Sequence, residues 1–341
     1  MSTSRRYWAI CAPVDAASMT QFANACEAVG LEGIWGIQLY GPPFIPLAAA
    51  AMVSKRLKLG TGVALAFTRS PLETALSAID IDTISGGRMV LGLGTSIRWW
   101  NESWHGVKYG KPIAHLRDVI KIVREIVAGA HTGKLGKIES ENYQLDLTGF
   151  RTLAPPVRER IPIYVPAVFQ SGVKLAGEIA DGLAGHPIWS ANWIRNEVSN
   201  VLRESLQKAG RKRSDVDLNI WAFVAIDEDR KKAIDATRGT VAFYASMEQY
   251  EKYFASHGFG AQARAAHEAA TRGDTTAMVN AIPDEMVTTF AIAGTRDEVR
   301  ERVEALWQTA DSMTLAAPAV FVDPALAGRY RAAIAETFYP T

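Results

Sequence analysis

Several patterns that define common classes of proteins are missing from this sequence. Its 341 residues include two cysteines, Cys11 and Cys26, which are too few for a disulfide framework or a four-cysteine zinc site. Six scattered histidines form no H-E-x-x-H pattern, and no G-x-S-x-G turn is present. We therefore expect neither a bound metal nor the serine chemistry of an α/β-hydrolase.

The sequence also has little net charge and no long apolar run. Lys and Arg number 37 against 36 Asp and Glu, and this balance gives no basic face for a nucleic acid. No segment reaches about 18 uninterrupted apolar residues, and the apolar run after Arg5 and Arg6 ends at Pro13, too early for a signal peptide. We expect a cytoplasmic protein with a small-molecule substrate and no nucleic-acid or membrane partner. A homodimer stays open.

What the sequence does contain is a regular alternation of strand-like and helix-like segments. Apolar strand-like runs lie at residues 7–12, 33–38, 57–66, 89–93, 161–165, 182–185, 216–226 and 312–316. Helical patterns alternate with them at 18–29, 44–53, 71–84, 114–128, 171–179, 193–209, 295–308 and 324–337. Eight β-α steps predict an α/β protein whose parallel strands close into a (β/α)₈ TIM barrel. A doubly wound open sheet is the alternative.

We expect a single domain over residues 1–341, with two departures from this rhythm. Short alternating segments with glycines at about 131–152 indicate a hairpin or another excursion, and the charged, alanine-rich residues 228–284 indicate a helical insertion. Local signals mark helix ends: Ser18 as an N-cap, Pro71 in a first turn, and Gly86 just past the third helix.

Residues 85–105 hold the densest group of candidate functional residues. An apolar strand ends in Gly94, Thr95 and Ser96, whose small side chains would let a flat ligand lie close to the backbone. Bulky aromatic and imidazole side chains follow at Trp99, Trp100, Trp104 and His105. This pattern favours a binding site after the fourth strand, although a core strand followed by an apolar loop explains it equally well.

The barrel prediction adds further candidates, because (β/α)₈ barrels carry their sites at the carboxyl-terminal ends of the strands. Those ends fall at Pro13 and Asp15, 38–40, 62–67, 95–100, 169–172, 186–189 and Asp227. They are mostly aromatic or polar-neutral, with few carboxylates and no convergent cluster of charge, which suits a large planar cofactor better than a hydrolytic acid–base pair. His115 and His131 are interpreted as surface or helix-end histidines, and Trp35 and Trp221 as core residues.

Four motifs resemble one known family. They are S-G-G-R-M-V-L-G-L-G-T-S at 85–96, L-K-L-G-T-G-V-A-L-A-F-T-R-S-P at 57–71, I-P-I-Y-V-P-A with L-A-G-E-I-A-D-G within 161–182, and A-G-T-R-D-E-V-R-E-R-V at 293–303. The chain resembles the bacterial luciferase-like superfamily. Within it, the chain is most similar to oxidoreductases that use the deazaflavin coenzyme F-420, of the methylenetetrahydromethanopterin reductase type. The resemblance implies a (β/α)₈ barrel with insertions.

The resemblance also implies roles for individual residues. Gly62 and Val63 fall where the family often has a non-prolyl cis peptide that supports the cofactor ring, and Thr95 and Ser96 would flank the cofactor. Gln38 stands in the place of a common acidic residue, and Leu39 in that of a common histidine. The implied phosphate site is the first turn of the helix at 171–179, formed by Gln170, Ser171, Gly172 and Val173. His186 falls at a cofactor position.

These observations predict an oxidoreductase, a reductase or dehydrogenase, that transfers a hydride between coenzyme F-420 and a small organic substrate. The side chains expected to wall the substrate are Trp99, Trp100 and Trp104, and the candidate proton donors are His105 and Tyr40. Two alternatives stay open: an FMN-dependent luciferase-like monooxygenase, and a non-catalytic barrel that binds a flavin or another ligand. The loss of both an acid and a histidine at Gln38 and Leu39 keeps the second alternative open.

Overall fold

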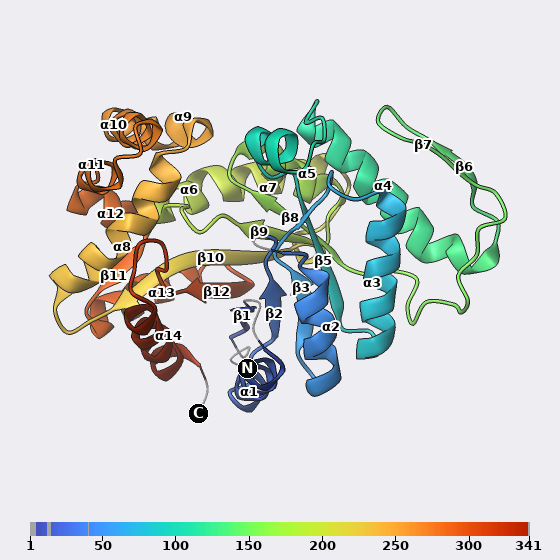
Figure 1. Cartoon of the computed structure of the whole chain (residues 1–341), viewed down its shortest axis with the longest axis horizontal. Coiled ribbons are helices and arrows are strands. Elements are labelled where there is room, and N and C mark those ends of the chain that lie inside the picture. Colours follow the sequence, from blue (N-terminus) through green and yellow to red (C-terminus); the bar gives the residue numbers. More distant parts are fainter. Residues whose placement is uncertain (1–4, 12–14, 40, 340–341) are drawn as a thin grey trace. The chain divides into compact units, whose positions relative to one another are not determined.

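The computed structural model describes residues 5–11, 15–39 and 41–339 (Figure 1). Its main sheet has the strand order β11-β10-β12-β1-β2-β3-β5-β8-β9, and β10 also pairs with β9. This is the strand order of a closed (β/α)₈ barrel, as the sequence predicts. The chain forms two compact units. The larger comprises Trp8–Ala184 and Leu202–Asp217, and the smaller comprises Gly185–Val201, Leu218–Thr341 and the N-terminal residues up to Tyr7.

The larger unit is organised around parallel strands. They are β1 (Tyr7–Cys11), β2 (Gly33–Gly36), β3 (Lys58–Thr61), β4 (Ala64–Leu65), β5 (Met89–Gly94), β8 (Ile163–Ala167) and β9 (Gly182–Gly185). Between β1 and β2 the fully buried rings of Trp8 and Trp35 stack with their centroids 4.1 Å apart. Gly33 and Gly60 lie opposite these tryptophans in the strand register, so each glycine leaves the space that an indole ring occupies.

The helices of the larger unit flank these strands (Figure 1). They are α1 (Ala16–Ala28), α2 (Phe44–Val53), α3 (Pro71–Ser85), α4 (Pro112–Gly129), α5 (Gln170–Ile179) and α7 (Ser199–Lys208). The N-cap prediction for α1 is wrong: Asp15 caps the helix by accepting from the N–H groups of Ala17 and Ser18, each at 3.0 Å. A carboxylate that reaches two free donors is a better cap than the Ser18 hydroxyl inside the first turn. Gly86, with φ of +69°, ends α3 as predicted.

The excursion predicted at 131–152 is an antiparallel hairpin of β6 (Gly136–Glu139) and β7 (Gln144–Leu147), beside α4 in Figure 1. Its tip is held to the first turns of α4. Asn142 Nδ2 donates to Asp118 at 2.8 Å, and Lys111 pairs with Glu141 at 3.0 Å. The hairpin is therefore a docked element of the larger unit.

The smaller unit contains β10 (Asp217–Ile226), β11 (Ile292–Gly294) and β12 (Ser312–Ala316). β10 pairs in parallel with β12 through its first half and with β11 through its last three residues. The sequence prediction contains no strand at 292–294, because three buried residues are too few for a periodic signal. The helix predicted at 193–209 is α6 (Ala191–Trp193), a π-helical turn (Ile194–Val198) and α7.

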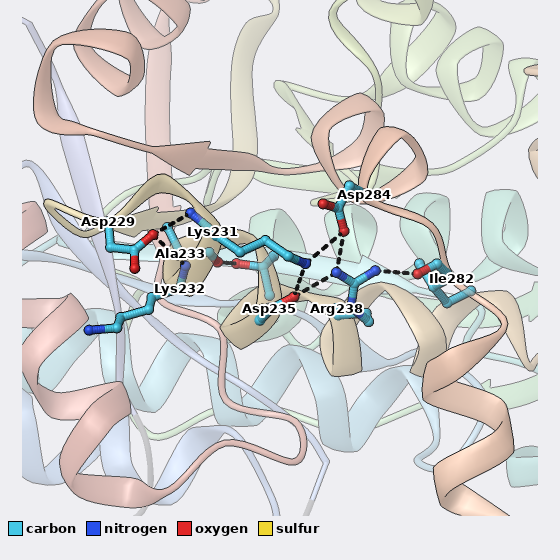
Figure 2. Close-up of polar contacts among 9 residues, drawn as sticks. Asp229, Lys231, Lys232, Ala233, Asp235, Arg238, Ile282 and Asp284 are labelled. Atoms are coloured by element: carbon cyan, nitrogen blue, oxygen red, sulfur yellow. Dashed lines mark hydrogen bonds and ion pairs between the residues drawn. The ribbon is translucent and has the colours of Figure 1, made fainter.

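Helices make up most of residues 228–284, as predicted for the insertion. They and the helices that follow are α8 (Arg230–Ala245), α9 (Glu251–Ala255), α10 (Gly260–Thr271), α11 (Thr275–Asn280), α12 (Asp284–Phe290), α13 (Arg296–Leu306) and α14 (Pro324–Phe338). Figure 2 shows the ion-pair network that joins α8 to the start of α12. Lys231 and Arg238 both contact Asp235 and Asp284, and Arg238 also donates to the carbonyl of Ile282. No helix within the described ranges is long and apolar enough to cross a membrane.

Candidate cofactor site

The ends of β2, β3 and β5 form the best-defined part of the candidate site in the larger unit. The Gly62–Val63 peptide bond, between β3 and β4, is cis, as the family resemblance predicts. The glycines of β5 make room for this segment: a Cβ at Gly94 would lie 2.6 Å from Val63 Cγ2 and 2.7 Å from Pro166 Cγ. The space that a side chain at Gly94 would occupy is therefore filled by protein, so packing explains this glycine, and the approach of a flat ligand to this strand end stays a prediction.

Gln38, two residues beyond β2, connects this strand end to the loop after β4. Its Oε1 accepts from the N–H of Leu65 and from Nη1 of Arg69, each at 2.9 Å, and its Nε2 lies 3.5 Å from Thr68 Oγ1. The amide oxygen is thus occupied by the chain itself. Our assignment of Gln38 to cofactor binding remains a prediction.

The segment after β5 is fixed by a residue that sequence reasoning missed. Asn101 is fully buried, and its Nδ2 donates to the carbonyls of Thr95 (2.9 Å) and Ile97 (2.8 Å). Its Oδ1 has no hydrogen-bond partner among the described residues. Ser96 has a φ of +54°, and its carbonyl accepts from the hydroxyl of Tyr109 at 2.9 Å. The sequence signal for Asn101 was its place as a polar residue between Trp100 and Trp104.

The three tryptophans form a cluster on and just before a π-helical turn at Trp100–Trp104. Trp100 stacks on Trp104 with centroids 5.0 Å apart, and Trp99 meets Trp104 edge-on at 5.1 Å. Trp99 is 57% exposed and Trp104 is 54% exposed. His105 is exposed beside them, and its side chain makes no hydrogen bond within the part of the chain that the structure describes. Tyr40, the other candidate proton donor, lies outside the described residues, as does Pro13.

The first turn of α5 combines two exposed and two buried residues. Gln170 and Ser171 are exposed, whereas Gly172 and Val173 are buried and their N–H groups lie 3.1 and 3.4 Å from the carbonyl of Phe169. A Cβ at Gly172 would lie 2.9 Å from the Cβ of Ala167, so this glycine allows α5 to pack against the end of β8. Gln170 and Ser171 are the members of this predicted phosphate site that a ligand could reach.

His186 follows β9 in the smaller unit and lies among aromatic side chains. Its Nε2 is 3.4 Å from the Tyr250 hydroxyl, its Nδ1 accepts from the N–H of Ile188 at 3.4 Å, and its ring meets Tyr244 edge-on at 5.0 Å. Enclosure by these neighbours lowers the pKa of His186 to about 3, and burial raises the pKa of Tyr244. The group is therefore uncharged at neutral pH. Tyr244 and Tyr250 come from the helical insertion, where the sequence offered no signal for them.

His115 lies near the start of α4, as a helix-end histidine, but it is not a free surface residue. Its ring stacks on Phe67 with centroids 4.0 Å apart, and its Nε2 is 2.8 Å from the Tyr143 hydroxyl. Burial lowers the pKa of His115 and raises the pKa of Tyr143 to about 12. Both groups are neutral near pH 7, and they join α4 to the hairpin. The described residues contain no group of three His, Cys, Asp or Glu side chains that could hold a metal ion.

The strand order, with aromatic and amide side chains at the described strand ends, defines a (β/α)₈ barrel of the class that carries its site at the carboxyl-terminal ends of its strands. The chain belongs to the luciferase-like monooxygenase family, whose model matches residues 4–312. The family is one of oxidoreductases.

Two relatives and one solved structure are similar to the chain. An uncharacterised protein of Mycobacterium tuberculosis is 32% identical over 291 residues, which cover 84% of this chain and 86% of that protein. The 5,10-methylenetetrahydromethanopterin reductase of Archaeoglobus fulgidus is 30% identical over 301 residues, which cover 84% of each chain. The solved structure of the coenzyme F-420-dependent tetrahydromethanopterin reductase of Methanopyrus kandleri superposes with a TM-score of 0.76 at 24% identity, covering 92% of this chain and 93% of that one.

Proposed function

We propose that this protein is a reductase or dehydrogenase in which coenzyme F-420 exchanges a hydride with a small organic substrate. The observation that carries the proposal is the scarcity of acidic groups among the described strand ends of the larger unit, where Gln38 and the buried Asn101 are amides. Hydride transfer needs orientation and exclusion of water more than it needs a strong protein acid. The 30% identity to a methylenetetrahydromethanopterin reductase supports the same choice.

The described residues fit a flavin-like ring in one specific respect. The unpaired Oδ1 of Asn101 is a buried acceptor beside Thr95, and the pyrimidine N–H of a flavin or deazaflavin is a donor of the kind that this acceptor lacks. When bound, F-420 would supply the hydride-carrying carbon. Gly62, Val63, Thr95 and Ser96 would hold the ring.

The remaining site residues receive proposed roles that match their exposure. In the larger unit, Gln170 and Ser171 would bind the cofactor phosphate at the N-terminus of α5. Trp99 and Trp104 would cover the substrate at the rim, with Trp100 stacked behind them. His105 is the proposed proton donor among the described residues, because it is exposed and uncommitted beside the tryptophans. In the smaller unit, His186 would offer a neutral hydrogen-bonding group to the cofactor.

An FMN-dependent monooxygenase is the second candidate, because the family's own description names monooxygenases. The two candidates differ in cofactor and in oxygen use. A luciferase-like monooxygenase would bind FMN and consume oxygen in the presence of substrate. A deazaflavin enzyme would consume no oxygen, because carbon replaces the ring nitrogen that makes reduced flavins react with oxygen.

The deciding experiment is a fluorescence titration of the purified protein with F-420, FMN and FAD, each oxidised and reduced. We expect F-420 to bind at least tenfold more tightly than FMN, and we expect no oxygen uptake on an oxygen electrode when reduced cofactor and candidate substrates are added. Binding of FMN without F-420, together with substrate-dependent oxygen uptake, would establish the monooxygenase instead. Binding of neither cofactor would leave the non-catalytic barrel.

A further inference from the structure

Arg69 lies between β4 and α3 and uses few of its hydrogen-bond donors. Nη1 donates to Gln38 Oε1 at 2.9 Å and lies 3.5 Å from Thr68 Oγ1. Nε and Nη2 have no acceptor among the residues that the structure describes, and no carboxylate there lies within 4.0 Å of the guanidinium. An arginine carries five N–H donors, so most of the hydrogen-bonding capacity of Arg69 is unused.

Three other partly buried arginines of the larger unit each have several acceptors. Arg88 donates to three backbone carbonyls near α2 and to its own turn. Arg158 binds Asp82 with two nitrogens and also reaches the carbonyl of Met89. Arg211 donates to four backbone carbonyls. Arg69 is the exception in this comparison, although it is buried to a similar degree.

The surroundings of Arg69 stabilise its charge only weakly. Burial lowers the pKa of its guanidinium, and the field of Glu73 opposes that shift, but Glu73 is exposed and forms no ion pair with it. The guanidinium carbon lies 5.4 Å from the centroid of the Phe44 ring, within cation–π range. Gln38, its one close hydrogen-bond partner, is neutral. A half-buried guanidinium with no counterion close by is a favourable partner for an anion.

We propose that Arg69 is an anion-binding residue of the candidate site and that it takes a carboxylate or phosphate oxygen of a bound small molecule. The planar guanidinium, held at Nη1 by Gln38, presents its remaining donors as a preorganised fork for two oxygens. Its place is favourable, because Gln38 follows β2 and Arg69 precedes α3, at the strand ends where barrels bind ligands. This role of Arg69 rests on the proposed function, and it means that the site recognises a negatively charged group of the bound molecule.

The anion has two sources, the phosphate-bearing tail of F-420 or an anionic substrate, and the experiment separates them. The probes are inorganic phosphate, F-420, and the deazaflavin chromophore without its tail, each titrated by calorimetry. The variants are Arg69→Met, Gln38→Glu and, as a matched control, Arg203→Met, which removes an exposed arginine of α7. Gln38→Glu keeps an acceptor for both Leu65 and Arg69 while placing a permanent carboxylate beside the guanidinium.

We expect the dissociation constant of phosphate to rise at least tenfold in Arg69→Met, several-fold in Gln38→Glu, and not at all in Arg203→Met. If the anion belongs to the cofactor, Arg69→Met also weakens F-420 binding and leaves binding of the tail-less chromophore unchanged. If it belongs to the substrate, both cofactor forms bind as before. The inference is overturned if neither phosphate nor F-420 binds more weakly to Arg69→Met and Gln38→Glu than to the wild type. Phosphate binding through Arg69 without any F-420 binding would refute the proposed function and leave this inference standing.

Discussion

Gly33→Ala provides the sharpest test of how the barrel core is built. Gly33 lies opposite Trp8 in β1 and Lys58 in β3, and an added Cβ would be 2.5 Å from Trp8 Cζ3 and 2.5 Å from the carbonyl oxygen of Lys58. Neither neighbour can yield easily. The Trp8 ring is stacked on Trp35 at 4.1 Å, and the Lys58 oxygen belongs to a paired strand.

The magnitude follows from these contacts. Overpacking a rigid core costs about 1–3 kcal/mol, and the backbone contact puts Gly33→Ala near the upper end. An unfolding entropy of about 2.1 cal/mol/K per residue gives roughly 0.7 kcal/mol/K for a chain of this length, so a loss of about 3 kcal/mol lowers Tm by about 4 °C. Gly41→Ala is the matched control: a Cβ at Gly41 would meet no atom within 4 Å, and we expect a change below about 0.5 kcal/mol.

The assay is thermal and urea unfolding followed by far-ultraviolet circular dichroism. Gly33→Ala should cost less in a Trp8→Leu background than in the wild type, because the indole contact is absent there while the Lys58 contact remains. A double-mutant cycle should therefore report a favourable coupling of about 1–2 kcal/mol. Equal stability of Gly33→Ala and Gly41→Ala would refute the argument that the tryptophan pair requires glycine at this position.

Three further predictions concern the candidate site and the insertion. Asn101→Ala removes the two hydrogen bonds to the Thr95 and Ile97 carbonyls and should weaken cofactor binding about tenfold, measured by titration, with the circular dichroism spectrum unchanged. Burial lowers the pKa of His186 to about 3, so between that value and the ordinary histidine pKa the unfolded chain binds a proton that the folded chain does not. The free energy of unfolding should therefore fall by about 1.4 kcal/mol per pH unit as the pH drops from about 6 toward 4. His186→Phe should reduce that slope in urea titrations at several pH values, and an unchanged slope would assign it to other groups. Arg238→Met should destabilise the insertion by about 1 kcal/mol in urea unfolding, because the half-exposed carboxylates of Asp235 and Asp284 and the Ile282 carbonyl lose this donor. The control is Lys232→Met, which changes an exposed lysine on the same helix.

Local chemistry in the sequence determined most of the elements. The buried strands at 33–36 and 182–185 are apolar runs bounded by turns, and Pro71 and Gly86 mark the ends of α3 through their own backbone preferences. The alternation of eight strand–helix pairs leaves few topologies besides a barrel. These signals act over a few residues, so they can be recognised in the sequence alone. The cis bond at Gly62–Val63 was predicted by a different route, the resemblance of its motif to a known family.

Only the tertiary structure decided what each candidate residue contacts. Gly94 makes room for Val63 and Pro166, His115 stacks on Phe67, and Tyr244 and Tyr250 surround His186 from an insertion more than fifty residues away. Among the described residues, the single close acceptor of Arg69 is Gln38, 31 positions earlier. Such contacts depend on how strands and helices distant in sequence pack together, and neither periodicity nor capping preference carries that information.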